Sequence, residues 1–471
     1  MKGSVINAGN GFGYDGAWYA AITKNFLEMV SNGELSLYRI QRILPSAAVK
    51  ILMTLLQIPV EDYFIIKSFQ FYNLVLLSAS SVIWIKISEL YNLSLKNIWF
   101  GFILGFINYG IFLMPFFYPV LTDITAFFLG FCLYYFYLRD NLIAKIIVTF
   151  LGAFTWPLLL FTGILLIIFP VTFRIKTENL QTGDHRSAKL IICLLSAVPF
   201  LIQALITLNQ YFSGMKIKTI FTQPVKPLMY FSSVLNFFIL VLFFYIILPG
   251  KISVVFSPVI LKKIIKQFRL KDVISALAII LFTQLLYRIL GNPAVESETD
   301  AGSIFYYMSV YSITKPLVYI VTSISYFGPV FMLCFILLKE YRIILLNSGI
   351  GIYITFIVSF LILLVTEARL ITSFFPVILV LTVLVVKKLN FRRSLFVIIS
   401  IFSLILSKIY IPMNNVPDLS SDRYSFTNQL YFMNTFMISK NSYYIQGILF
   451  LFMTVVFVFF YRKRNHNITN N

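Results

Sequence analysis

Long and nearly uninterrupted runs of apolar residues follow one another from residue 64 almost to the end of the chain. An α-helix needs ~20 apolar residues to cross the hydrocarbon core of a membrane, and the runs lack the alternating pattern of a transmembrane barrel. They therefore predict a bundle of transmembrane helices. The predicted spans lie at 64–85, 98–115, 120–138, 141–155, 157–172, 189–208, 229–249, 273–290, 316–338, 343–365, 371–387, 394–411 and 444–461.

The two neighbouring runs 141–155 and 157–172 are short for two full crossings. Trp156-Pro157 separates them, because proline removes a backbone donor and disfavours helix at the residue before it. The pattern permits two crossings, one long kinked helix or a re-entrant hairpin. The alternation of basic loops along the chain favours two crossings.

Residues 1–63 are less apolar than the rest of the chain. Within them, the stretch 43–58 has a helical pattern but is short and carries Lys50, which predicts a helix in the membrane interface. Residues 64–461 form the predicted bundle, and residues 462–471 form a basic tail. The expected fold is therefore all-α, a polytopic transmembrane bundle of about 12–13 spans, preceded by an outer segment of interfacial helices.

The composition agrees with a membrane protein, since 59% of the residues are hydrophobic and only 12% are charged. The net charge of +20 comes mainly from short basic loops, so we expect the lipid bilayer and no nucleic acid as a partner. The cysteines stand apart in apolar runs, and both histidines stand in polar stretches. We therefore expect no disulfide framework, no metal site and no cofactor.

The basic residues gather in alternate loops between the predicted spans. By the positive-inside rule these loops are cytoplasmic, which places residues 1–63 and the longer, more acidic loops on the outer side of the cytoplasmic membrane. We expect any chemistry on that outer face. The chain opens without the pattern of a signal peptide. An outer N-terminal segment then either crosses the membrane by itself or follows a first helix upstream, and we expect the second.

A carboxylate lies among aromatic residues close to the start of the chain. Asp15 is accompanied by Tyr14, Trp18 and Tyr19 and by glycines, which let the backbone approach a ligand closely. A carboxylate at an apolar boundary suits a general base, and aromatic rings stack on sugars. The commoner alternative is a turn aspartate with interfacial aromatic anchors.

Arg39 and Arg42 stand three positions apart, on one side of the chain if this stretch is helical. Guanidinium groups bind phosphate oxygens with a forked geometry. Contact with lipid headgroups explains such a pair equally well, so the two arginines predict either a phosphate site or a membrane anchor.

Further charges stand where predicted outer loops meet spans. Asp123 opens the span 120–138 and either caps that helix or has a function. Glu367 and Arg369 occupy a tight turn before an apolar run. They predict either a contact with a substrate phosphate or an ion pair that ties two helices.

A series of short features resembles the GT-C superfamily of membrane glycosyltransferases. In chain order these features are the outer aspartate, Y-R-I-Q-R-I-L-P, Y-P-V-L-T-D, T-W-P and a late E-A-R before an apolar helix. The resemblance covers the order of elements over most of the chain. It implies a GT-C-like fold and the transfer of a sugar from a polyprenyl-phosphate carrier to a glycan, lipid or protein acceptor.

The resemblance also implies roles for individual residues. Asp15 would be the catalytic base that takes a proton from the acceptor hydroxyl. Arginines would stabilise the departing phosphate, and further acidic residues would orient them or the acceptor. The residues implied to bind phosphate or substrate are Arg39, Arg42, Asp123, Glu367 and Arg369, with Tyr14, Trp18, Tyr19 and Trp156 as aromatic contacts to sugar or lipid.

Three other functions compete with this interpretation. A transporter or flippase of lipid-linked glycan would have paired broken helices and charges deep in its spans, whereas the sequence indicates one break, at Trp156-Pro157. A glycan polymerase with a large outer loop would show dense arginines there, whereas the loop 412–443 contains Arg423 alone among arginines. The third is a structural membrane subunit without a reaction.

Overall fold

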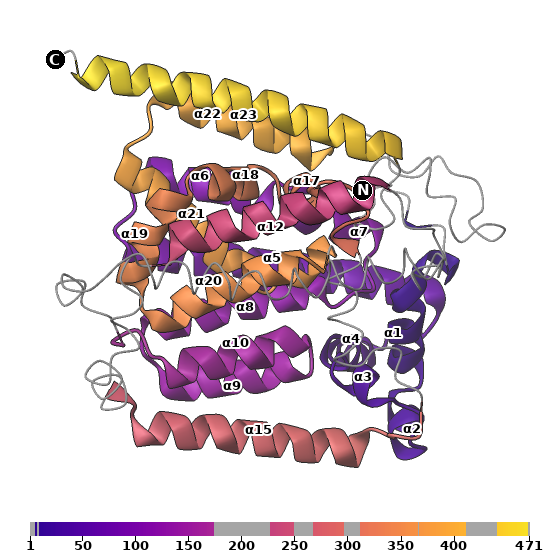
Figure 1. Ribbon diagram of the computed structural model, residues 1–471. Helices are drawn as coiled ribbons and strands as arrows, with labels where there is room; N and C mark the ends of the chain where they lie inside the picture. The colour runs from indigo at the N-terminus through magenta and orange to yellow at the C-terminus, as the bar shows by residue number, and fades with distance from the viewer. Residues whose placement is uncertain are drawn as a thin grey trace.

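The computed structural model describes residues 5–6, 9–173, 227–248, 267–295, 311–365, 367–410 and 440–469. Every regular element within these ranges is a helix, as the apolar pattern predicts. Most of the longer helices lie side by side in a bundle (Figure 1). The predicted span 189–208 and most of the predicted outer loop 412–443 lie outside the described residues.

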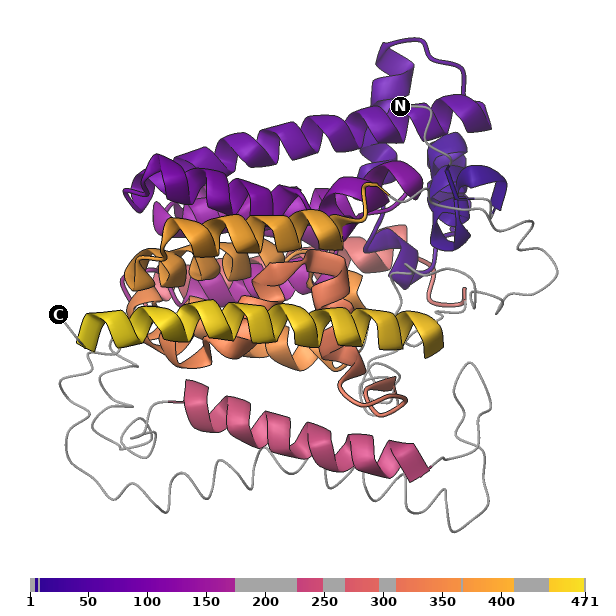
Figure 2. The same cartoon turned by 90° about the horizontal axis from the view of Figure 1, so that it is seen from above.

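Short helices of the N-terminal segment gather at one end of the bundle (Figures 1 and 2). The longest of them, α4, buries Val49 and Met53 and exposes Ile51 and Leu55. Exposed apolar side chains beside a buried face suit a helix in the membrane interface. The segment consists of η1 Gly9–Gly11, α1 Tyr14–Lys24, α2 Phe26–Ser31, α3 Leu37–Ile40 and α4 Leu44–Leu55.

The bundle follows this segment. Helix α21 lies within it, and most side chains of α21 are buried. Its first described half has α5 Asp62–Leu90, α6 Leu95–Phe106, η2 Tyr109–Leu113, α7 Met114–Phe117, α8 Asp123–Leu138, α9 Leu142–Ala153 and α10 Pro157–Ile168. The remaining elements are α12 Pro227–Ile247, α15 Leu270–Leu290, α17 Val318–Phe327, α18 Pro329–Ile336, α19 Leu338–Ser348, α20 Ile350–Leu363, η4 Ala368–Ile371, α21 Phe375–Leu389, α22 Arg393–Ser407 and α23 Lys440–Thr469.

Several helices could span a membrane, as expected of a multi-pass protein. Among the described residues, four helices are long and apolar enough, and a bent pair brings the number to five. The four are α5, α12, α15 and α23. Other apolar helices have 10–17 residues, fewer than the ~20 that a full crossing needs. Within the described residues, therefore, fewer helices than the expected 12–13 spans are long enough to cross a membrane, and part of the bundle is built from shorter helices.

Breaks within the predicted spans account for the shorter pieces. The predicted span 98–115 bends by 67° between α6 and η2. Asn108 stabilises this break, because its side chain accepts a hydrogen bond from Ile111 N and donates one to Gly105 O. The predicted spans 316–338 and 343–365 are also interrupted, at two glycines with positive φ that only glycine adopts readily, Gly328 and Gly349. The expectation of a single break at Trp156-Pro157 is thus corrected.

The two short runs 141–155 and 157–172 form an antiparallel hairpin, α9 and α10. Lys145 Nζ near the start of α9 donates to Leu166 O near the end of α10 at 3.2 Å. This contact excludes one long kinked helix. Each helix has 12 residues and is about 18 Å long, so each is shorter than a hydrocarbon core of about 30 Å.

Loops that the charge pattern assigns to one face do meet at one end of the bundle. Lys387 Nζ donates to Tyr91 O at 2.8 Å, and Lys96 Nζ donates to Phe391 O at 2.9 Å. These pairs are separated by nearly 300 positions in the sequence, so the alternation of basic loops predicts which ends of distant helices lie together.

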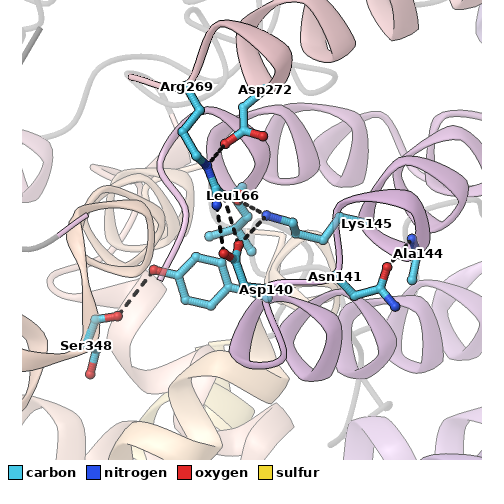
Figure 3. A network of polar contacts seen from close by, with 9 residues as sticks. Asp140, Asn141, Ala144, Lys145, Leu166, Arg269, Asp272 and Ser348 are labelled. Carbon is cyan, nitrogen blue, oxygen red and sulfur yellow. Dashed lines mark hydrogen bonds and ion pairs between the residues drawn. The ribbon is translucent and has the colours of Figure 1, made fainter. Parts of the chain in front are cut away.

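A partly buried ionic network at the same end holds α15 against the bundle (Figure 3). Arg269 donates two hydrogen bonds to Asp140, at 2.8 and 3.0 Å, and one to Asp272 at 2.6 Å. Lys145, which has no exposed side-chain surface, lies 3.6 Å from Asp140. The arginine therefore joins the start of α15 to the turn between α8 and α9.

We expect Arg269→Ala to lower the free energy of unfolding by about 3 kcal/mol, because the fully buried Asp272 carboxylate loses its partner. Thermal unfolding in one detergent provides the measurement. Glu340→Gln is the control, since its exposed pair with Lys388 is worth no more than about 1 kcal/mol. Equal losses in the two variants would contradict the assignment of Arg269 as an anchor.

Candidate active site

Arg369 is the centre of a charged cluster at the N-terminal-segment end of the bundle. It lies in η4, between α20 and α21, and its side chain is 12% exposed. Its Nη2 donates to Asp15 Oδ2 at 2.7 Å, and its Nε donates to Glu367 Oε1. The pair with Asp15 joins residues 354 positions apart, so the early aspartate and the late E-A-R turn form one site.

Backbone contacts fix the turn that carries Arg369. The indole of Trp156, which is 2% exposed, donates to Leu370 O at 3.4 Å. Phe154 O, two residues earlier, accepts from Leu44 N at 2.9 Å. The T-W-P break between α9 and α10 thus lies between the E-A-R turn and the start of α4, and it holds these three segments together.

Two glycines place Asp15 against the loop before α8. A Cβ atom at Gly13, where φ is +78°, would lie 2.2 Å from the ring of Tyr118. Gly16 N donates to the hydroxyl of the same tyrosine at 3.4 Å. The sequence predicts that these glycines admit a ligand, but the space beside them is filled by Tyr118, which locks α1 to the Y-P-V-L-T-D segment.

We expect Gly13→Ala to displace the Tyr118 ring and to reduce both thermal stability and any activity of the cluster. Gly328→Ala is the matched control, because Gly328 has nearly the same φ and ψ as Gly13, but its Cβ would meet nothing closer than 3.7 Å. The backbone strain is therefore similar in the two variants, at about 1–3 kcal/mol, whereas only Gly13→Ala produces a clash. Melting temperatures in detergent measure the difference. If the two variants have the same melting temperature, the close packing of Tyr118 against Gly13 does not contribute to stability.

Arg39 and Arg42 lie beside this cluster and are both buried, at 7% and 8% exposure. The Arg39 guanidinium lies 4.9 Å from the ring centre of Trp18, and that of Arg42 lies 4.0 Å from the ring centre of Tyr38 and 5.1 Å from that of Trp156. Such contacts are cation–π interactions. The buried Nη1 of Arg42 has no hydrogen-bond acceptor among the described residues.

The arginines control the charge of Asp15. Burial alone raises the pKa of this carboxyl, but Arg369, followed by Arg42 and Arg39, holds the pKa below its usual value. Burial raises the pKa of the Tyr38 hydroxyl although Arg42 opposes it, so this phenol remains neutral. The cluster therefore contains an ionised carboxylate, Asp15, close to three guanidinium groups.

Asp123 lies behind Arg369 at the first turn of α8 and is 6% exposed. Neither of its carboxylate oxygens accepts a hydrogen bond from a described residue, and the N-cap residue Thr122 makes no side-chain capping bond. Among the charged groups around it, Arg369 interacts most strongly with the Asp123 carboxylate. The start of a helix also favours a negative charge. The capping interpretation of Asp123 therefore has no hydrogen bond to support it in the described part of the chain.

The structure brings most of the sequence-predicted residues together. Trp18 is 50% exposed at the rim, whereas Tyr19 is buried, with its hydroxyl within electrostatic reach of Arg42 and Asp15. The side chain of Tyr14 lies outside the described part of the chain. The cluster contains Asp15, Trp18, Tyr19, Arg39, Arg42, Asp123, Trp156, Glu367 and Arg369.

Two further residues that contact the cluster, Tyr38 and Tyr118, were not singled out from the sequence. Each stands within a motif noted above, Y-R-I-Q-R-I-L-P and Y-P-V-L-T-D, next to the charged residues chosen there. Tyr38 packs under Arg42, and Tyr118 packs against the backbone of Asp15 and its neighbours. Tyrosines at an apolar boundary are so common that neither carried a signal of its own.

No group of three or more metal-ligating side chains lies within the described residues. Comparison of the chain with protein-family models, with curated proteins and with solved structures finds no match. Function must therefore be inferred from the residues themselves.

Proposed function

We propose that this cluster is the active site of a membrane glycosyltransferase with a GT-C-like fold. The enzyme moves a sugar from a polyprenyl-phosphate carrier to an acceptor on the outer side of the cytoplasmic membrane. The observation that carries the proposal is the ion pair of Asp15 with Arg369, beside the buried Arg39 and Arg42. A carboxylate and three guanidinium groups from distant segments supply a proton acceptor and a phosphate site in one place.

The arginines would hold the carrier phosphate. Arg42 Nη1 is a buried donor without a described acceptor, and leaving a buried donor unsatisfied costs about 1–3 kcal/mol. A phosphate oxygen at this point would accept a hydrogen bond from Arg42 Nη1 and remove that cost. Trp18, half-exposed and stacked against Arg39, offers an aromatic face to the sugar or to the lipid chain.

Asp15 would act as the base. The acceptor hydroxyl attacks the anomeric carbon while the bond from that carbon to the phosphate oxygen breaks, and the polyprenyl phosphate leaves with the bonding electron pair. Asp15 takes the hydroxyl proton. In the resting site Arg369 holds the pKa of Asp15 low, which makes it a weak base. A phosphate bound to Arg369 shares this positive charge and so strengthens the base. Glu367 orients Arg369 through their ion pair, and Asp123 acts on Arg369 through its charge alone.

A transporter is the second candidate function, because several helices of the bundle are broken. The breaks at Asn108 and Gly328 face each other, since a Cβ at Gly328 would lie 3.7 Å from that of Asn108, and paired breaks mark transport sites. However, Ser403 Oγ donates to Ile107 O at 2.9 Å, and Asn108 donates to Gly105 O. Protein side chains thus satisfy carbonyls that a transported ion would coordinate.

Reconstituted protein and isotopically labelled polyprenyl-phosphate sugars test the two candidates, with cell-envelope extract as the source of acceptors. The proposal predicts that free polyprenyl phosphate is released and that the label appears in another product. A transporter would instead move the labelled donor across the vesicle and leave it intact. Failure of every donor in a panel of sugars to release polyprenyl phosphate contradicts the enzyme.

A further inference from the structure

A groove between α6 and α22 lies at the opposite end of the bundle from the charged cluster. It has a volume of about 480 Å³. The two helices run in the same direction, so both begin at the end where Lys96 and Arg393 line the groove. Farther along, the walls are apolar and include Phe100, Val397 and Leu404.

The charged end of the groove suits an anion. Lys96 and Arg393 both line it, and Lys96 Nζ is fixed there by a hydrogen bond to Phe391 O and by the Phe396 ring, 3.9 Å away. Within the described part of the groove no acidic side chain offsets them. Helix starts add partial positive charge. Trp99, 58% exposed on the wall, is of the residue type that gathers at the headgroup level of membranes.

The length of the apolar part suits one acyl chain. Arg393 and Leu404 are eleven positions apart on α22, which corresponds to about 16 Å along a helix. One leaflet of a hydrocarbon core is about 15 Å thick, half of about 30 Å. Val397, Ile401 and Leu404 are each 44–51% exposed along this wall. The groove therefore has a cationic end and an apolar trough that match the two parts of a phospholipid.

We propose that this groove binds one anionic phospholipid, with its phosphate headgroup between Lys96 and Arg393 and an acyl chain along α22. The occupant is a lipid of the leaflet on the basic side of the bundle, where anionic headgroups attract basic residues. This site shares no residue with the charged cluster, so the proposal stands whether or not the cluster transfers a sugar.

Native mass spectrometry of the purified full chain, titrated with phosphatidylglycerol or phosphatidylcholine, tests the proposal. One phosphatidylglycerol should be retained in preference to phosphatidylcholine. Arg393→Gln should weaken that binding about fivefold, the effect of one cation near a headgroup. Arg392→Gln is the matched control, because it removes the same charge one position away, outside the groove. Equal weakening in both variants, or no preference for the anionic lipid, overturns the site.

Ser400→Trp fills the apolar trough without changing the charge, since Ser400 lines the groove. It should prevent retention of phosphatidylglycerol while the melting temperature without lipid stays near that of the wild type. Retention of the lipid by this variant would contradict the proposed position of the acyl chain along α22. Competition by soluble glycerol phosphate as strong as that by the lipid would also overturn it, because it would indicate a site for a small anion.

Discussion

Asp15→Asn is expected to abolish sugar transfer, by at least about 100-fold, while membrane insertion and abundance remain at the wild-type level. General bases contribute about 10²–10⁴-fold to rate, and an amide cannot take the acceptor proton. The side-chain oxygen of asparagine keeps a hydrogen bond from Arg369, so the fold should persist. The measurement is release of polyprenyl phosphate by reconstituted protein.

Asp62→Asn is the control for this variant. Asp62 also belongs to the charged residues near the N-terminal segment, but it pairs with Lys24 at 2.5 Å and is 37% exposed. It lies outside the cluster, and its substitution should leave transfer unchanged. Normal transfer by Asp15→Asn would eliminate Asp15 as the base, and an equal loss in both variants would point to a general charge effect.

Arg369→Gln is expected to have the second large effect, on stability as well as on transfer. Removing one partner of a buried ion pair costs roughly 3–5 kcal/mol, because the remaining charges stay buried. Here Asp15 and Glu367 would both lose their partner. Arg369→Lys should recover only part of the loss, since a compact ammonium group cannot hold two carboxylates with a planar fork.

The contribution of this ion pair should depend on pH with a definite sign. The pKa of Asp15 in the folded protein is below its usual value, so the unfolded chain binds protons first as the pH falls. The stabilisation is fully present above the unfolded pKa of about 3.9 and is lost as the pH falls through the folded pKa. The difference in melting temperature between wild type and Arg369→Gln should therefore be constant near neutral pH and shrink in acid.

A double variant separates stability from chemistry. Combining Arg369→Gln with Asp15→Asn removes the uncompensated charge of Asp15 and should restore part of the lost melting temperature, but transfer should remain absent. If transfer returns with stability, the pair has only a structural role.

The helical class and the two ends of the bundle follow from residue patterns that act locally. Apolar runs predict helices, and basic residues such as Lys96 and Lys387 indicate which loops share an end. The break at Asn108 was harder to predict, because it interrupts an apolar run without a proline beside it. The break at Gly328-Pro329 has a proline signal like that of Trp156-Pro157 and was overlooked. Whether asparagine breaks a helix depends on partners such as Ser403, nearly 300 positions away.

The charged residues of the cluster could be predicted from the sequence, but their arrangement in space could not. An apolar chain makes charged residues such as Asp15, Arg39 and Arg369 conspicuous. Each of them could nevertheless be explained by a turn, a lipid contact or a structural ion pair. No local rule connects positions 15 and 369. The role of Gly13 was also misjudged, because the residue that fills the space beside it, Tyr118, is brought there only by the fold. The local sequence allowed several roles for each of these residues, and the packing between distant segments determines which role each one has.

The proposed function depends above all on the binding of a lipid-linked phosphate by the three arginines beside Asp15. A structure determined by electron cryomicroscopy with added polyprenyl phosphate tests this binding. We expect phosphate density within hydrogen-bond distance of Arg42 Nη1 and Arg369, with the lipid chain leaving past Trp18. Phosphate bound elsewhere, with the pair of Arg369 and Asp15 unchanged and the donor of Arg42 still unoccupied, would contradict it.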